Sequence, residues 1–188
     1  MTKNKSLLLG VIAAVALTTT AQAADKNFEG FYAGAELGYN NINLGNTSNS
    51  GGLYYGGMAG YRIQMPSNLV LGLEARFGDS TATEMVGFGE TNVEISAGRQ
   101  LGVDAIFGYA MGDNKDVLAY GFLGYTNAKV TGSALGANTS ATGDGLRFGL
   151  GAEYVLTDNM SLRVTGAYAD YSGSLRDWQL NSGIVFRF

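Results

Sequence analysis

The residues of this chain that could do chemistry are carboxylates and guanidinium groups at alternate positions of apolar segments. In a narrow space such groups can act as an acid–base pair, line a path for ions, or neutralise one another in a plug of salt bridges. The carboxylates are Glu36, Glu74, Asp104 and Glu153, and the guanidinium groups are those of Arg62, Arg76, Arg147, Arg163 and Arg187.

The chain contains no histidine and no cysteine. Activation of a serine nucleophile usually needs a histidine base, and zinc or copper sites usually need histidine or cysteine ligands. The sequence also lacks a phosphate-binding loop and a dinucleotide fingerprint, and its acidic turns at 113–116 and 142–145 lack the spacing of a calcium loop. We therefore expect a protein that is not an enzyme and that binds no metal and no cofactor.

The charged residues are positioned by segments in which apolar and polar residues alternate with a period of two, the pattern of β-strands. In residues 146–156, for example, Leu150 and Tyr154 share one face, whereas Arg147 and Glu153 share the other. We expect eight strands, at residues 31–39, 53–64, 69–78, 93–109, 117–130, 146–156, 160–170 and 177–188.

The connections between these segments alternate between long and short, which is typical of an antiparallel up-and-down barrel with loops at one end and tight turns at the other. If the turn at 157–159 closes symmetrically, Glu153 lies directly across from Arg163, with both side chains on one face. The long connections are 40–52, 79–92, 131–145 and 171–176, and the short ones are 65–68, 110–116 and 157–159.

The start of the chain has the composition of a secretory signal. Lys3 and Lys5 precede an apolar run at 7–17, and residues 21–23 read Ala-Gln-Ala, a small-x-small cleavage pattern. The run is too short to span a bilayer as a helix. We expect residues 1–23 to be a cleaved signal peptide and residues 24–188 to form one barrel domain; a retained buried helix is the alternative.

Alternation alone does not say which face of the sheet is buried. A soluble barrel turns its apolar face inward, whereas a membrane barrel turns it outward. Export favours the second arrangement, and so do glycines on the polar face, which leave room for charged side chains in a narrow lumen. We therefore predict an all-β, eight-stranded, antiparallel up-and-down transmembrane β-barrel. The glycines in question are Gly34, Gly38, Gly56, Gly60, Gly72, Gly149, Gly151 and Gly183.

In such a barrel the nine charged residues face the lumen. An ion path is one interpretation of them, and a plug of salt bridges is the other. Eight strands enclose an interior that side chains just fill, and buried charges must be paired, so the plug is favoured.

One segment fits the alternation less well: Tyr120 and Phe122 lie on one face of 117–130, and Leu123 and Tyr125 lie on the other. A bulge or a set of larger inward side chains would explain this.

The chain ends with a polar residue, a glycine two positions later, and aromatic residues at the antepenultimate and last positions. These residues are Asn181, Gly183, Phe186 and Phe188. This pattern resembles the terminal-strand signal of bacterial outer-membrane barrels. The resemblance implies recognition by the barrel assembly machinery, with Phe188 as the anchoring residue.

The chain after the signal segment resembles the eight-stranded outer-membrane barrels of the OmpA/OmpX and opacity-porin type. The stretch 28–39 is similar to their opening strand and 160–171 to their penultimate one. The resemblance implies a place in the bacterial outer membrane, contact with its lipid, and external loops that carry any recognition of a host or surface ligand. Binding to nucleic acid is not expected, because the formal net charge is −4.

Two functional classes follow. The first is a structural or surface-interaction barrel that supports envelope integrity, adhesion or host contact through its loops. The alternative is a narrow porin or a channel for ions or small solutes. Within the connection 79–92, Met85, Val86 and Phe88 stand among acidic residues and form a candidate contact patch. The competing interpretation is that these three residues cap the barrel mouth or extend the strands.

Overall fold

The computed structural model describes residues 26–44, 49–88, 91–134, 137–172 and 175–188. No helix among these residues is long and apolar enough to cross a membrane. The strands are β1 (Gly30–Leu44), β2 (Asn49–Gln64), β3 (Leu69–Ser80), β4 (Thr83–Phe88), β5 (Thr91–Met111), β6 (Val117–Ala134), β7 (Ala137–Thr157), β8 (Met160–Tyr171) and β9 (Leu175–Arg187).

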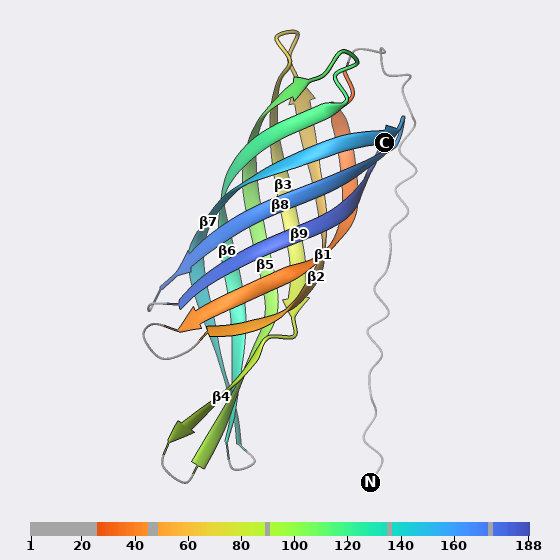
Figure 1. Cartoon of the computed structure of the whole chain (residues 1–188). Helices are drawn as coiled ribbons and strands as arrows, with labels where there is room; N and C mark the ends of the chain where they lie inside the picture. The colour runs from red at the N-terminus through yellow and green to blue at the C-terminus, as the bar shows by residue number, and fades with distance from the viewer. Residues whose placement is uncertain (1–25, 45–48, 89–90, 135–136, 173–174) are drawn as a thin grey trace, which may run out of the picture.

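The strands form one closed antiparallel barrel (Figure 1). Each strand of the wall pairs with its neighbours in the chain, and β1 pairs with β9 to close the circle. On the other side β3 pairs directly with β5, so β4 lies outside the wall and pairs with the outer part of β5. The barrel therefore has eight strands, as the alternation predicts, and the ninth strand belongs to a projecting hairpin.

The predicted strands are all present, but their predicted outer ends were wrong. Strand β7 begins at Ala137 rather than 146, and β2 begins at Asn49 rather than 53. The connection 79–92 was predicted as a loop, yet it contains β4. Backbone hydrogen bonds between strands do not depend on side-chain polarity, so the ladders continue where the apolar alternation has ended.

The apolar face of the wall points outward. Leu73 is 63% exposed and Leu150 is 74% exposed, whereas the charged residues on the opposite face are almost completely buried. Along β8, buried and exposed residues alternate almost without exception. This confirms the membrane arrangement, in which lipid covers the apolar surface and charged side chains fill the lumen.

Strand β6 carries large inward side chains, which explains its irregular pattern. Tyr120 and Phe122 are buried, and no register shift interrupts β6 beside them. Their rings lie over glycines of the next strand: a Cβ atom on Gly149 would meet the ring of Phe122, and one on Gly151 would meet the ring of Tyr120. Of the two explanations offered by the sequence, the larger inward side chain is the correct one.

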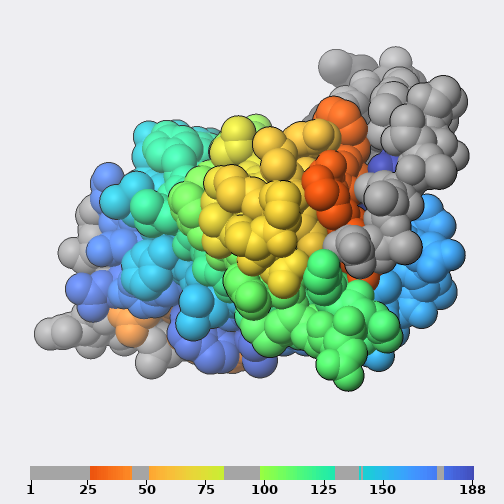
Figure 2. Space-filling model, turned by 90° about the horizontal axis from the view of Figure 1, so that it is seen from above, coloured from red at the N-terminus to blue at the C-terminus, as the bar shows by residue number. Residues whose placement is uncertain are grey.

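The end with the short turns is filled by the residues that precede β1. Phe28 is 1% exposed and packs in an apolar cluster with inward residues that include Val70 and Leu118. Its backbone N–H donates to Oε1 of Gln64 at 3.0 Å, and the Asn27 amide donates to two carbonyls of the β5–β6 turn. Figure 2 shows the red-orange start of the described chain lying against the yellow part of the wall at this end. The lumen is thus blocked on the side of the chain termini.

Candidate functional site

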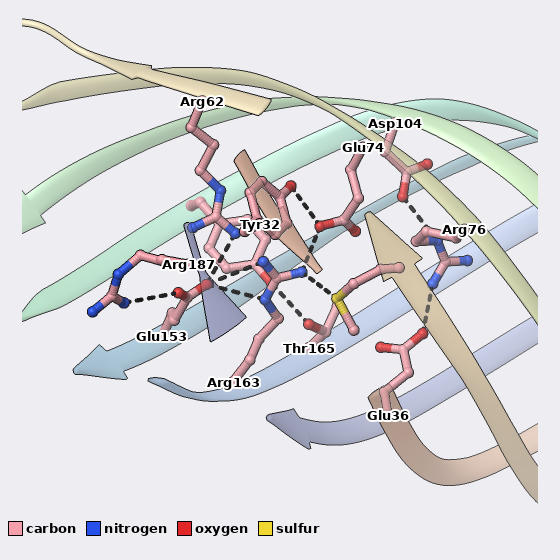
Figure 3. A network of polar contacts seen from close by, with 12 residues as sticks. Tyr32, Glu36, Arg62, Glu74, Arg76, Asp104, Glu153, Arg163, Thr165 and Arg187 are labelled. Carbon is pink, nitrogen blue, oxygen red and sulfur yellow. Dashed lines mark hydrogen bonds and ion pairs between the residues drawn. The ribbon is translucent and has the colours of Figure 1, made fainter. Parts of the chain in front are cut away.

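The nine charged residues predicted to face the lumen all point into it and are buried. They come from seven strands of the wall, and the tilt of the strands brings together residues that are far apart in the sequence. Figure 3 labels all of them except Arg147 and shows two groups, one around Glu153 and Glu74 and the other around Arg76.

Glu153 is the centre of the first group. Its Oε2 atom lies 2.9 Å from Nη2 of Arg62, and it accepts hydrogen bonds from Nε and Nη2 of Arg163, both at 3.1 Å. Glu153 is paired with Arg163 in the β7–β8 register, as the sequence predicts. Nη1 of Arg187 lies farther away, 3.9 Å from Oε1. One carboxylate thus faces three guanidinium groups in a space closed to water.

Glu74 balances the excess of positive charge in this group. Its Oε2 atom lies 2.6 Å from Nη1 of Arg163 and accepts a hydrogen bond from the Tyr32 hydroxyl at 2.7 Å. The Arg62 guanidinium stacks on the Tyr32 ring, with Cζ 3.9 Å from the ring centroid. Stacking on an aromatic ring suits the weakly hydrated guanidinium group, so Tyr32 supports the ion pairs both as a donor and as a surface.

The second group lies around Arg76. Its Nη1 atom is 3.1 Å from Oε1 of Glu36, and its Nε atom is 3.1 Å from Oδ2 of Asp104. Asp104 also pairs with Nη1 of Arg147 at 2.5 Å. The Arg147 guanidinium in turn lies 4.4 Å from the centroid of the Phe122 ring. The two groups therefore form chains of alternating charge that cross the lumen between distant strands.

Arg187 joins the network to the end with the short turns. Its Nη1 atom donates to Oγ of Ser161, and its Nη2 atom donates to the carbonyls of Thr157 and Asp158 at 3.1 and 3.0 Å. The short turn between β7 and β8 is therefore held by a side chain of the last strand.

Sequence reasoning missed Asp177, which is 2% exposed. Its Oδ2 atom accepts hydrogen bonds from Gln179 at 2.7 Å and from Gln100 at 3.2 Å. Asp177 precedes the outward Trp178, so the alternation of the strand would have predicted that Asp177 faces the lumen. With Asp177 included, the residues whose burial the structure describes comprise five buried carboxylates and five buried guanidinium groups, whose formal charges balance.

This arrangement joins strands on different sides of the lumen through ion pairs. Each of the four predicted carboxylates has a guanidinium partner, and each guanidinium group of the network is buried. Desolvated charges are tolerated only when they are paired in this way. The lumen of the described structure is a salt-bridged core.

The two other predicted sites lie at opposite ends of the molecule. Of the terminal residues, Asn181 is buried in the lumen, whereas Phe186 and Phe188 are each 48% exposed on the outer face. Met85 and Phe88 lie in β4, where they pair with Glu94 and Thr91 of β5. Val86 lies between them in the same strand. The side chains of this patch lie outside the described part of the structure, but its backbone extends the sheet.

Comparisons with known proteins agree with this architecture. The family model of the outer membrane protein beta-barrel domain matches residues 10–188. The 31 kDa outer-membrane immunogenic protein of Brucella melitensis is 30% identical over 131 residues, which cover 64% of this chain and 55% of the relative. The same values hold for the protein of that name in Brucella suis. The chain thus spans little more than half the length of the curated relatives it matches.

Solved structures show the same fold at low sequence identity. The neisserial surface protein NspA superposes with a TM-score of 0.63 at 19% identity, covering 85% of this chain and 98% of NspA. Ail, the attachment invasion locus protein of Yersinia pestis, gives 0.57 at 18% identity, covering 85% of this chain and 99% of Ail. Together with the outward apolar wall, these matches identify the chain as a member of the outer membrane protein beta-barrel domain family, located in the bacterial outer membrane.

Proposed function

We propose that this protein is a non-enzymatic surface-interaction barrel, in which a closed, salt-bridged core anchors external hairpins that contact a host or another surface. The observation that carries the proposal is the projection of two hairpins, β4–β5 and β6–β7, well beyond the rest of the wall (Figure 1). They lie at the end opposite the short turns, which is the external side in barrels of this kind.

The lengths of the strands give the scale of this projection. A tilted membrane strand needs about 9–11 residues, and β5 and β7 have 21 residues each. The excess of roughly ten residues corresponds to about 30 Å along the strand at ~3.3 Å per residue. Such ribbons keep their backbone groups paired and present side chains far from the membrane surface, which suits contact with a partner.

The names of similar proteins support the same function. The Brucella relatives are called outer-membrane immunogenic proteins. Ail is named for attachment and invasion, and it has been solved in complex with the heparin analogue sucrose octasulfate. By analogy, we propose adhesion or host contact through the external hairpins, with the barrel also contributing to envelope integrity.

The lumen argues against the alternative of a narrow porin. Its charges are buried and bound to one another, and Phe28 closes the end with the short turns. An ion that entered would have to displace salt bridges inside a low-dielectric space, which costs several kcal/mol. The absence of histidine in the sequence adds to the proposal that the barrel performs no hydrolysis or acyl transfer.

The test replaces Met85, Val86 and Phe88 with serine and measures how many bacteria bind to cultured host cells. We expect binding to fall several-fold, because an apolar patch on a projecting ribbon would supply the buried contact area. The matched control is the double variant Met65→Ser/Met111→Ser, which removes exposed apolar side chains at the opposite, periplasmic end. Both variants must show the gel mobility of a folded barrel before and after boiling. Wild-type binding by a folded triple variant would contradict the contact patch.

A further inference from the structure

We propose that the outer face of β1, β8 and β9 binds a phosphorylated, acylated glycolipid of the outer leaflet in a defined site, with its sugar–phosphate headgroup beside Arg176 and an acyl chain over Gly166. This site is separate from the hairpins and does not depend on the proposed adhesion.

Two hollows on this face adjoin one another. The first, of about 480 Å³, is lined by residues that include Tyr39, Asn41, Asn43 and Arg176. The second, of about 710 Å³, extends over β5 to β9 and is lined mostly by apolar residues and glycines, with Gln179 among them. Tyr168 and Trp178 line both hollows, so the two form one continuous groove with a polar end and an apolar end. The three strands lie side by side in the wall (Figure 1).

The register of the strands orders these residues by their distance from the outer end of the barrel. Arg176 pairs with Asp170 on one side and with Asn43 on the other, which makes a polar row near the outer end. One step toward the periplasm, Trp178 pairs with Tyr168 and with Asn41.

A further step down, the row is apolar. Leu180 pairs with Gly166 on one side and with Tyr39 on the other, and Gly166 also pairs with Leu150 of β7. The sequence from charged, through aromatic, to apolar matches the order of groups in a lipid that stands in the outer leaflet.

The polar row and the aromatic residues below it offer the groups that recognise a phosphorylated sugar. Arg176 is exposed and, within the described part of the chain, makes no hydrogen bond or ion pair of its own. A free guanidinium group binds phosphate through paired donors. Trp178 and Tyr39 meet edge to face at 6.3 Å and provide aromatic surface for a sugar ring. The Asp170 carboxylate and the Asn41 amide can bind its hydroxyl groups.

The apolar row is hollowed at Gly166. The nearest neighbour of a Cβ atom there is the carbonyl oxygen of Leu150, at 4.0 Å, so this glycine leaves open space beside larger apolar side chains. Leu150 and Leu180 flank the gap and are exposed. A notch of this kind accommodates a hydrocarbon chain along the wall. A headgroup bound at the polar row would place the start of that chain beside the notch.

The chain has one tryptophan, Trp178, and it lies between the two hollows. Its fluorescence is therefore a direct reporter of occupancy. The folded protein in nonionic detergent is titrated with the bisphosphorylated, acylated glucosamine disaccharide of Gram-negative outer leaflets. We expect a saturable change in emission. Arg176→Gln should raise the half-saturation concentration about tenfold or more, because a charge-assisted contact to phosphate is lost. Lys129→Gln, which removes another exposed outward cation, should leave it unchanged.

Two further titrations separate the parts of the site. Gly166→Leu should weaken binding of the acylated probe by filling the notch, and the open space around Gly166 lets this variant fold, as unboiled gel mobility would verify. Phosphatidylglycerol, an anionic lipid without the sugar, should bind at least tenfold more weakly than the glycolipid. The proposal is overturned if Arg176→Gln and Lys129→Gln behave alike, if Gly166→Leu binds as wild type, if phosphatidylglycerol binds equally well, or if the emission change never saturates.

Discussion

Nη2 of Arg62 lies 2.9 Å from Oε2 of Glu153, and both side chains are 1% exposed or less, although the residues are 91 positions apart in the chain. The contact spans the lumen from β2 to β7. A buried ion pair of this kind links strands on different sides of the lumen, and removing either partner would leave the other charge buried with fewer partners.

The first prediction concerns Glu153→Gln. This change keeps the shape of the side chain but leaves Arg62 and Arg163 without their shared carboxylate. Removing one partner of a buried pair typically costs about 3–5 kcal/mol, so we expect the free energy of unfolding to fall by that amount. Reversible urea unfolding in lipid bilayers measures it.

The control is Asp158→Asn, which removes an exposed carboxylate from the turn that follows Glu153. Its effect should stay within about 0.5 kcal/mol. Equal effects of the two changes would mean that the lumen pair contributes no more than a surface charge.

The second prediction concerns the contact between Tyr120 and Gly151. A Cβ atom at Gly151 would collide with the Tyr120 ring, so Gly151→Ala should destabilise the barrel by about 1–3 kcal/mol. Gly143→Ala is the matched control, because the nearest atom to its new methyl group is 4.0 Å away.

The steric cause of the Gly151→Ala effect can be checked with a double-mutant cycle. In a Tyr120→Ala background the added methyl group has space, so Gly151→Ala should then cost much less. Additive effects in unfolding experiments would rule out a clash with the Tyr120 ring.

The third prediction separates assembly from stability. Phe188 is half exposed on the outer face, and its backbone N–H donates to the carbonyl of Phe31 at 3.0 Å. If the terminal residues are an assembly signal, Phe188→Ala should lower the folded fraction in cells several-fold. For the variant refolded in detergent, the free energy of unfolding should fall by no more than about 1.5–3 kcal/mol, the ordinary contribution of an apolar side chain.

Leu150→Ala is the comparison, because Leu150 is also an outward apolar residue but lies far from the chain end. Quantifying unboiled and boiled bands from outer-membrane fractions gives both folded fractions. A drop of the same size in both variants would mean that Phe188 acts only as a lipid-facing side chain.

The wall of the barrel could be predicted from the sequence because side chains alternate strictly between lipid and lumen. Counting outward from the turn at 157–159 placed Arg163 across from Glu153, and this pair is present although the register shifts between Val155 and Thr157. The alternation did not predict that Arg163 also binds Glu74, which is 89 positions away. Pairs across the lumen depend on strand tilt and on the closure of the barrel, and no local pattern encodes either of them.

There are specific physical reasons why the sequence did not place some residues and strand ends correctly. Tyr32 was not predicted in the lumen, and Tyr120 was predicted there only as one of two explanations of an irregular strand, because aromatic residues of membrane barrels are usually outward; both rings lie over glycines that make space for them. Asp177 was overlooked although its alternation was inward. The outer ends of the strands were misplaced because polar ribbons outside the membrane need only backbone pairing, which leaves little trace in composition.

The central claim is that the lumen is closed by its own charges and that contact with the outside takes place on the external surface. Single-channel recording of the refolded protein in planar bilayers tests it most directly. We expect no steady conductance for the wild-type barrel, because ion pairs such as Arg62–Glu153 and the apolar plug at Phe28 fill the interior. Stable ohmic steps of uniform size, present in the wild type and changed in size by Glu153→Gln, would contradict the claim and establish an ion channel instead.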